Sequence, residues 1–198
     1  ATAKPLVESG QHGLLEDFEQ LWYNTTNGIW DSKESLIEVP FYANVISSGD
    51  PVGRIGKWNG VPAPQRKTDF IRISSYWYVI PTFISQWTNY STDKRWKLSF
   101  ADYQYDDNLN VKLIGKGFEA AINGTESDRK PFNGKLYPAK WDLVKYADTF
   151  LSDANYTNTN WYILRYSDVL LLYAEALNEL NKAPTDDAYE AINMVRRR

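Results

Sequence analysis

Few residues in this sequence are of the types that carry enzymatic or metal chemistry. The 198 residues include no Cys and a single His, His12. Without Cys there are no thiol nucleophiles, disulfides, zinc fingers or iron–sulfur clusters, and one His excludes metal sites built from several imidazoles. No nucleophile motif accompanies His12, so a solvated side chain near the terminus is favoured over a catalytic triad.

Acidic residues give no better support for a reaction. Asp106, Asn108 and Asn110 occupy the first three ligand positions of a calcium loop. The sixth and twelfth positions hold Val111 and Gly117 instead of Gly and Glu, so a hairpin turn is the better interpretation. The 25 acidic residues always allow some pair of carboxylates, but no motif selects two of them.

Aromatic residues are far more prominent. The chain has 8 Trp, 14 Tyr and 8 Phe, which is 15% of its residues. Aromatic rings can stack on the apolar faces of sugars while polar neighbours hydrogen-bond the hydroxyls. The candidate ligand-binding residues are therefore Trp58 with its polar neighbour Asn59, and the aromatics Trp77, Tyr76 and Trp30. Of these, Trp58 lies outside any apolar period.

Trp58 is the leading candidate because of its surroundings. It lies in a Gly- and Pro-rich stretch from 47 to 64, which predicts a long loop. Long loops in compact domains are often functional. The alternative is that Trp58 anchors this loop onto the domain. Trp30 is expected in a turn.

The elements that position these residues follow from apolar spacing. Tyr76, Trp77 and Tyr78 belong to an expected strand from 70 to 79, in which Trp77 faces away from its neighbours. The spacing also predicts helices at 13–22 and 82–87, a strand at 34–42, a hairpin of 96–105 with 110–114, and a loop with short extended pieces at 116–140.

The strongest periodicity lies near the C-terminus. Apolar residues from Tyr162 to Leu180 recur three and four positions apart, which predicts one stripe on a helix. Thr185 is a suitable N-cap for a second helix, so the two form a helical hairpin. One hairpin cannot bury its own face, and no stop signal precedes Arg198. We therefore expect a piece of a longer protein; the alternative is a natural basic terminus.

This hairpin resembles the SusD/RagB family, surface lipoproteins of Bacteroidetes that capture glycans. The resemblance rests on residues 162–180, YILRYSDVLLLYAEALNEL, and residues 188–197, AYEAINMVRR. Weaker matches are Asp93-Lys-Arg95 and Lys145-Tyr146. Ser167-Asp168 replaces the family's usual Ala-Glu without disturbing the stripe.

The resemblance implies a mainly α-helical fold with short strands and long loops. Residues 160–198 would belong to a truncated scaffold of tetratricopeptide-like helix pairs, and residues 1–159 to a loop-rich ligand-binding region with a β-hairpin. The implied function is non-catalytic glycan binding at the outer-membrane surface, for uptake through a SusC-like TonB-dependent transporter. The membrane would be reached only through a lipid anchor outside this chain, and no metal or cofactor is implied.

Charge and hydropathy are consistent with this assignment. The net charge of -3 and a pI near 5.3 argue against a nucleic-acid partner. The longest apolar stretch, 169–174, is far shorter than the ~20 residues of a membrane helix. Two alternative functions stay open: a carbohydrate-active hydrolase, and a helical-repeat scaffold that binds peptides along its helices.

Overall fold

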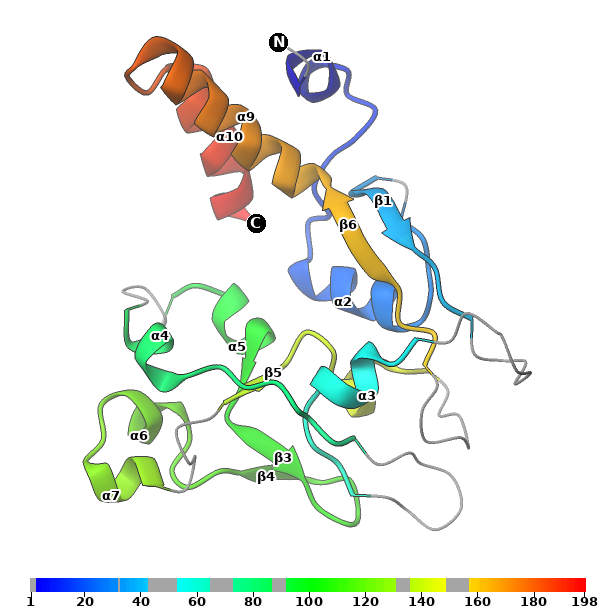
Figure 1. Cartoon of the computed structure of the whole chain (residues 1–198), viewed down its shortest axis with the longest axis vertical. Coiled ribbons are helices and arrows are strands. Elements are labelled where there is room, and N and C mark those ends of the chain that lie inside the picture. Colours follow the sequence, from blue (N-terminus) through cyan, green and yellow to red (C-terminus); the bar gives the residue numbers. More distant parts are fainter. Residues whose placement is uncertain are drawn as a thin grey trace. The chain divides into compact units, whose positions relative to one another are not determined.

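Figure 1 shows the chain as a computed structural model, which describes residues 3–31, 33–42, 53–64, 73–86, 92–130, 136–148 and 157–198. The chain forms two compact units. Unit 1 consists of Ala1–Thr25, Ile29–Pro40 and Asn160–Arg198, and unit 2 consists of Thr26–Gly28 and Phe41–Thr159. Within the ranges described, no helix is both long enough and apolar enough to span a membrane.

Unit 1 combines helices with one two-stranded antiparallel sheet. Its elements are α1 (Ala3–Glu8), α2 (Phe18–Thr26, all but the last residue), β1 (Ser35–Val39), β6 (Trp161–Arg165), α9 (Tyr166–Asn181) and α10 (Asp186–Arg197). Strands β1 and β6 pair with each other, and α9 packs against α10 (Figure 1). The predicted strand at 34–42 and the helical hairpin are thus confirmed, whereas the helix predicted at 13–22 begins only at Phe18.

The core of unit 1 is the hairpin of α9 and α10. Tyr166, Leu170 and Tyr173 are buried on α9 and meet the small buried residues of α10, Ala188 and Ala191. These small side chains let the two helices approach closely. The predicted apolar stripe is not buried at its C-terminal end, where Leu180 is 80% exposed. At the start of α10, the Thr185 side chain accepts a hydrogen bond from the Ala188 N–H at 3.2 Å, as its N-cap role predicts.

The first residues of the predicted helix 162–180 form a strand instead. Residues 161–165 are β6, because β1 supplies backbone partners to them, including Glu38 opposite Tyr162. Arg165 is extended, with φ -118° and ψ 162°, and its N–H donates to the Asp168 carboxylate at 2.9 Å. Tyr162 is therefore half-buried beside the Trp22 ring, and does not lie on the helix stripe.

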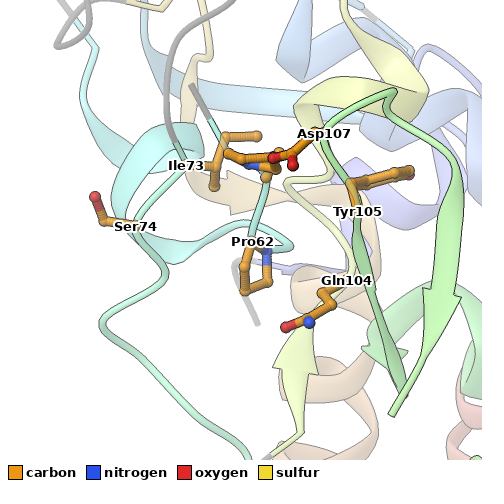
Figure 2. Close-up of a pocket in the computed structure, with 8 residues that line it drawn as sticks. Pro62, Ile73, Ser74, Gln104, Tyr105 and Asp107 are labelled. Carbon is orange, nitrogen blue, oxygen red and sulfur yellow. The ribbon is translucent and has the colours of Figure 1, made fainter. Parts of the chain in front are cut away.

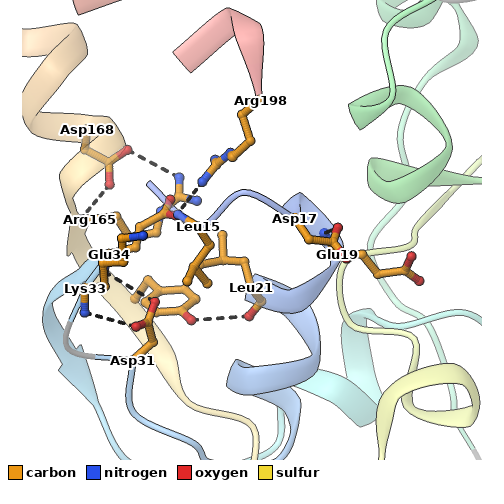
Figure 3. A network of polar contacts seen from close by, with 11 residues as sticks. Leu15, Asp17, Glu19, Leu21, Asp31, Lys33, Glu34, Arg165, Asp168 and Arg198 are labelled. Atoms are coloured by element: carbon orange, nitrogen blue, oxygen red, sulfur yellow. Dashed lines mark hydrogen bonds and ion pairs between the residues drawn. The ribbon is translucent and has the colours of Figure 1, made fainter. Parts of the chain in front are cut away.

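A buried ion pair holds separate segments of unit 1 together (Figure 3). The Glu34 carboxylate is fully buried, accepts the Leu15 N–H at 2.9 Å, and pairs with the Arg198 guanidinium. The same guanidinium lies over the Phe18 ring at 5.0 Å. A buried carboxylate needs such partners, because an unpaired charge is very costly away from water.

Unit 2 is built from short elements. Its helices are α3 (Ile55–Asn59), α4 (Pro81–Ser85), α5 (Arg95–Ser99), α6 (Phe118–Ile122), α7 (Glu126–Arg129) and α8 (Leu143–Tyr146). Two antiparallel pairs accompany them, β2 (Phe100–Ala101) with β5 (Tyr137–Pro138), and β3 (Tyr103–Tyr105) with β4 (Val111–Leu113). The second pair confirms the predicted hairpin, and α4 confirms the helix predicted after Pro81.

The strand predicted from residue 96 is wrong in its first half. Arg95–Ser99 is the helix α5, and the Asp93 carboxylate accepts the Arg95 N–H at 3.0 Å where this helix begins. The Arg95 guanidinium also forms an ion pair with the Asp93 carboxylate, with a nitrogen–oxygen distance of 2.6 Å. Trp96 and Phe100, four positions apart, then pack edge to face at 5.4 Å. Both are buried in the core of unit 2.

The loop predicted at 116–140 contains two helices that periodicity did not reveal. Both α6 and α7 are too short to show an apolar period. The start of α7 is marked by a capping box at Thr125. The Thr125 side chain accepts a hydrogen bond from the Asp128 N–H, and the Asp128 carboxylate accepts one from the Thr125 N–H. This capping box is readable from sequence as Thr-x-x-Asp.

Overall, the described residues form helices and short antiparallel strands joined by irregular segments, as predicted. The expected division into a ligand-binding region at 1–159 and a scaffold hairpin at 160–198 stays a prediction. Parts of the loop predicted at 47–64 and of the strand predicted at 70–79 lie outside the described residues. The described part of that strand is wrong, because residues 73–79 pair with other segments only through single bridges at Ile73 and Val79.

Candidate ligand-binding site

Four large aromatic side chains are exposed close together on unit 2. Trp58, on α3, is 38% exposed, and Tyr76, Trp77 and Tyr78 are 62%, 68% and 43% exposed. The rings of Trp58 and Tyr76 meet edge to face with centroids 5.8 Å apart. We call these four residues the aromatic surface. Its exposure is notable, because aromatic side chains in folded proteins are usually largely buried.

Backbone hydrogen bonds bring the two parts of the aromatic surface together. The Tyr76 N–H donates to the Trp58 carbonyl at 2.5 Å, and the Ser74 N–H donates to the Lys57 carbonyl at 2.9 Å. Ala63 and Ile73 form an antiparallel bridge farther along the same two segments. Trp58 is therefore set beside Tyr76 by main-chain geometry as well as by ring contact.

The glycines on either side of Trp58 serve close packing. A Cβ on Gly56 would lie 2.6 Å from Leu143 Cδ2, and one on Gly60 would lie 2.2 Å from the Trp141 carbonyl oxygen. Neither distance is sterically possible without a shift of the neighbour. The Gly-rich composition predicted a long loop, but these glycines let the short helix α3 approach its neighbours.

Polar and aromatic neighbours extend the surface. The Arg54 guanidinium lies 5.8 Å from the centre of the Trp58 ring, within cation–π range. Tyr78 contacts the Tyr137 ring at 6.0 Å. Partial burial, and then the neighbouring Tyr78, raise the pKa of Tyr137, so its phenol is neutral at pH 7. Arg54, Tyr78 and Tyr137 were not predicted as site residues, although the alternation of Tyr76 and Tyr78 was a usable signal.

The five predicted residues are therefore distributed unequally. Trp58, Tyr76 and Trp77 lie together on unit 2. Asn59 is adjacent but half-buried, and its Oδ1 is enclosed without a hydrogen-bond partner among the described residues. Trp30 is 66% exposed and belongs to unit 1. A ligand-binding role for each of the five stays a prediction.

A buried carboxylate braces the strand β3 of the same unit. Asp142 is fully buried, and its Oδ2 accepts hydrogen bonds from the Tyr103 and Tyr105 hydroxyls, both at 2.8 Å. Its Oδ1 caps α8 by accepting the Lys145 N–H at 3.2 Å. Burial raises the pKa of the Asp142 carboxyl, and the hydrogen bonds from Tyr105 and Tyr103 offset only part of this rise.

This carboxylate is expected to make stability depend on pH. Because the pKa of Asp142 is higher in the folded than in the unfolded chain, the folded chain binds more protons between the two values. The free energy of unfolding, measured relative to Asp142→Asn, should therefore increase as pH falls from the raised pKa toward the ordinary Asp value of about 3.9. Urea titrations of both proteins between neutral and acid pH test this, and a difference that is flat or grows with pH would contradict it.

Metal chemistry has no visible support in the ranges described. They contain no group of three or more His, Cys, Asp or Glu residues that could hold a metal ion. The expectation that no metal or cofactor is bound stays a prediction.

Comparisons with known proteins give a consistent family. The SusD family matches residues 77–198. A SusD homolog from Bacteroides thetaiotaomicron VPI-5482 superposes with a TM-score of 0.90 at 46% identity, over 99% of this chain and 38% of that one. A SusD superfamily protein from Parabacteroides distasonis ATCC 8503 gives a TM-score of 0.61 at 16% identity, over 98% and 36%. Surface glycan-binding protein A from B. thetaiotaomicron, in complex with laminarihexaose, gives a TM-score of 0.65 at 19% identity. This match covers 98% of this chain and 41% of that protein.

The comparison with curated protein sequences gives no significant match. The structures at 16% and 19% identity establish similarity of fold, and this chain spans about two-fifths of the length of each of these three proteins. The family match covers more than half of the chain and includes the hairpin motif. Together with the homolog at 46% identity, it shows that this chain belongs to the SusD family.

Proposed function

We propose that this chain carries a non-catalytic glycan-binding surface, in which Trp58, Tyr76 and Trp77 make the main contacts. The observation that carries the proposal is the aromatic surface of unit 2, where the Trp58 and Tyr76 rings meet edge to face and the adjacent Trp77 and Tyr78 are exposed. Asn59 and Trp30 remain secondary candidates, and Tyr78 joins the main group.

Stacking explains why exposed rings suit a glycan. The faces of pyranose rings carry C–H groups that pack on aromatic planes, and the hydroxyls around them need hydrogen-bond donors and acceptors. The exposed phenols of Tyr76 and Tyr78 and the Arg54 guanidinium supply such groups at the edge of the aromatic surface. No charge pair is needed, so a neutral oligosaccharide suits this surface.

Proteins of the same fold support the ligand class. Surface glycan-binding protein A was solved with laminarihexaose bound, and another similar structure, at 20% identity and a TM-score of 0.61, is a laminarin binding SusD-like protein. Family membership also supports a place at the outer membrane, with a lipid anchor outside this chain and a SusC-like TonB-dependent transporter as the partner that receives the glycan.

The proposal is tested on the full-length protein that contains this chain. Neutral oligosaccharides are titrated into it by calorimetry, and the same mixtures are assayed for newly formed reducing ends. We expect binding without product release. Released product would instead support a hydrolase, and the absence of any glycan binding would favour a scaffold that binds peptides.

A matched pair of variants links binding to the surface. Tyr76→Ala removes an exposed ring from the aromatic surface, whereas Tyr189→Ala removes a similarly exposed ring, 55% accessible, from α10. Only the first is expected to weaken glycan binding. Equal losses in both variants would count against the aromatic surface.

A further inference from the structure

Unit 2 also holds a pocket that the proposed site does not use (Figure 2). Its volume is about 540 Å³, within the range of small-ligand sites. Segments 62–64 and 73–74 line it together with β3 and the turn that follows. The lining residues are Pro62, Ala63, Pro64, Ile73, Ser74, Gln104, Tyr105 and Asp107.

The lining combines apolar walls with a small number of polar groups. Pro62, Ile73 and the Tyr105 ring are apolar, and the Tyr105 hydroxyl is already bonded to Asp142 at 2.8 Å. Ser74, Gln104 and Asp107 add a hydroxyl, an amide and a carboxylate. Among the described residues, none of these three side chains has a hydrogen-bond or ion-pair partner.

These groups match the needs of a ring that carries hydroxyls. A sugar hydroxyl both donates and accepts, and the Gln104 amide and Ser74 hydroxyl can do both as well, whereas the Asp107 carboxylate only accepts. Asp107 is the only charged group among the described lining residues, and its carboxylate repels negative charge placed beside it. A carboxylate or sulfate on the sugar would meet this like charge at short range.

The pocket is also within reach of the aromatic surface. Ser74 lines the pocket, and Tyr76, two positions later, belongs to the aromatic surface. Two residues span at most about 7 Å of chain. The same backbone segment therefore contributes to both places, and one oligosaccharide can touch both.

We propose that this pocket is a subsite for one uncharged sugar ring of the glycan, and that Asp107 selects against uronic acid and sulfated rings. The inference rests on the proposed function, since it assumes that a glycan lies on the aromatic surface. Gln104 and Ser74 hydrogen-bond the hydroxyls of the ring, and the Pro62 side chain packs on its apolar face.

The test uses neutral hexasaccharides of glucose, mannose and galactose, laminarihexaose among them, and their counterparts oxidised to the carboxylate at C6. Gln104→Ala is expected to weaken binding of the neutral sugars about tenfold, or about 1.4 kcal/mol, as for a lost hydrogen bond. Gln11→Ala, at an exposed position of unit 1, is the matched control. Melting temperatures show whether each variant is folded.

The charge is tested separately with Asp107→Asn, which keeps the shape of the side chain. We expect its affinity for the oxidised sugars to rise about tenfold over the parent protein, with little change for the neutral sugars. If Gln104→Ala binds the neutral sugars as tightly as the parent does while Tyr76→Ala binds them weakly, the pocket is not a subsite. The glycan-binding role of the aromatic surface is then still supported. If the parent binds the neutral sugars and neither variant affects binding, both the pocket and the contact at Tyr76 are overturned. If the parent binds none of the neutral sugars, the proposed function itself fails. Equal affinity of Asp107→Asn and the parent for the oxidised sugars overturns the selectivity.

Discussion

Replacing Leu170 by Ala is expected to lower the free energy of unfolding by about 2–5 kcal/mol. Leu170 is completely buried in the core of unit 1, among Tyr166, Ala174 and Ala191. Truncation removes one methine and two methyl carbons from this core and leaves a cavity that the two helices can close only in part. Urea titration of the variant and the parent protein measures the loss.

Leu172 provides the matched control two positions along the same helix. It is 57% exposed, so Leu172→Ala removes few contacts and should change stability by no more than about 0.5 kcal/mol. A near-neutral result for Leu170→Ala would mean that α9 and α10 do not pack as the structure shows. Equal losses in both variants would point to helix propensity and away from burial.

Trp58→Ala is expected to weaken glycan binding by roughly five- to hundredfold. Stacking on one aromatic ring contributes about 1–3 kcal/mol, by analogy with the stacking of nucleic-acid bases. Trp58 presents more than a third of its surface to solvent and lies against Tyr76, so its loss also disturbs the neighbouring ring. Calorimetric titration with an oligosaccharide already shown to bind the parent protein gives the affinity ratio.

Stability separates the two roles considered for Trp58. If Trp58 contacts the ligand, the melting temperature of Trp58→Ala should stay close to that of the parent protein. If Trp58 anchors the surrounding segment, the melting temperature of the variant should decrease strongly. Trp161→Ala, at a 44% exposed Trp on β6, controls for the removal of an indole ring. Unchanged affinity in Trp58→Ala would transfer the leading role to Trp77 or Trp30.

Local signals were sufficient for the helical hairpin and for the family. Apolar residues three and four apart in α9, and the Thr185 N-cap of α10, act within one turn of the chain, so their effect is visible in sequence. The hairpin of β3 and β4 was likewise predictable, because a short turn at Asp106 joins two alternating segments; its carboxylate accepts the N–H groups of Asn108 and Asn110. The family resemblance lies in the same hairpin of helices.

The sequence predicted several residues of the candidate site, but it did not predict which of them contact one another. Sequence identified Trp58 as an aromatic residue outside any apolar period, and Tyr76 and Trp77 as members of a run of three aromatics. The pairing of Trp58 with Tyr76 depends on a hydrogen bond between residues 18 positions apart, which no local pattern encodes. The pocket likewise joins residues near 62, 73 and 105, and only the folded chain brings these together.

The sequence alone therefore determined which segments repeat with helical period, where α10 begins, and which aromatic residues have no core period to bury them. The tertiary structure decided the rest. Residues 161–165 could continue the period of α9, but β1 offers them backbone partners and makes them a strand. The glycines near Trp58 could form a loop, but contact with Leu143 and Trp141 requires residues without side chains there. In both places partners distant in sequence outweigh local preference, because buried backbone groups must be hydrogen-bonded and buried space must be filled.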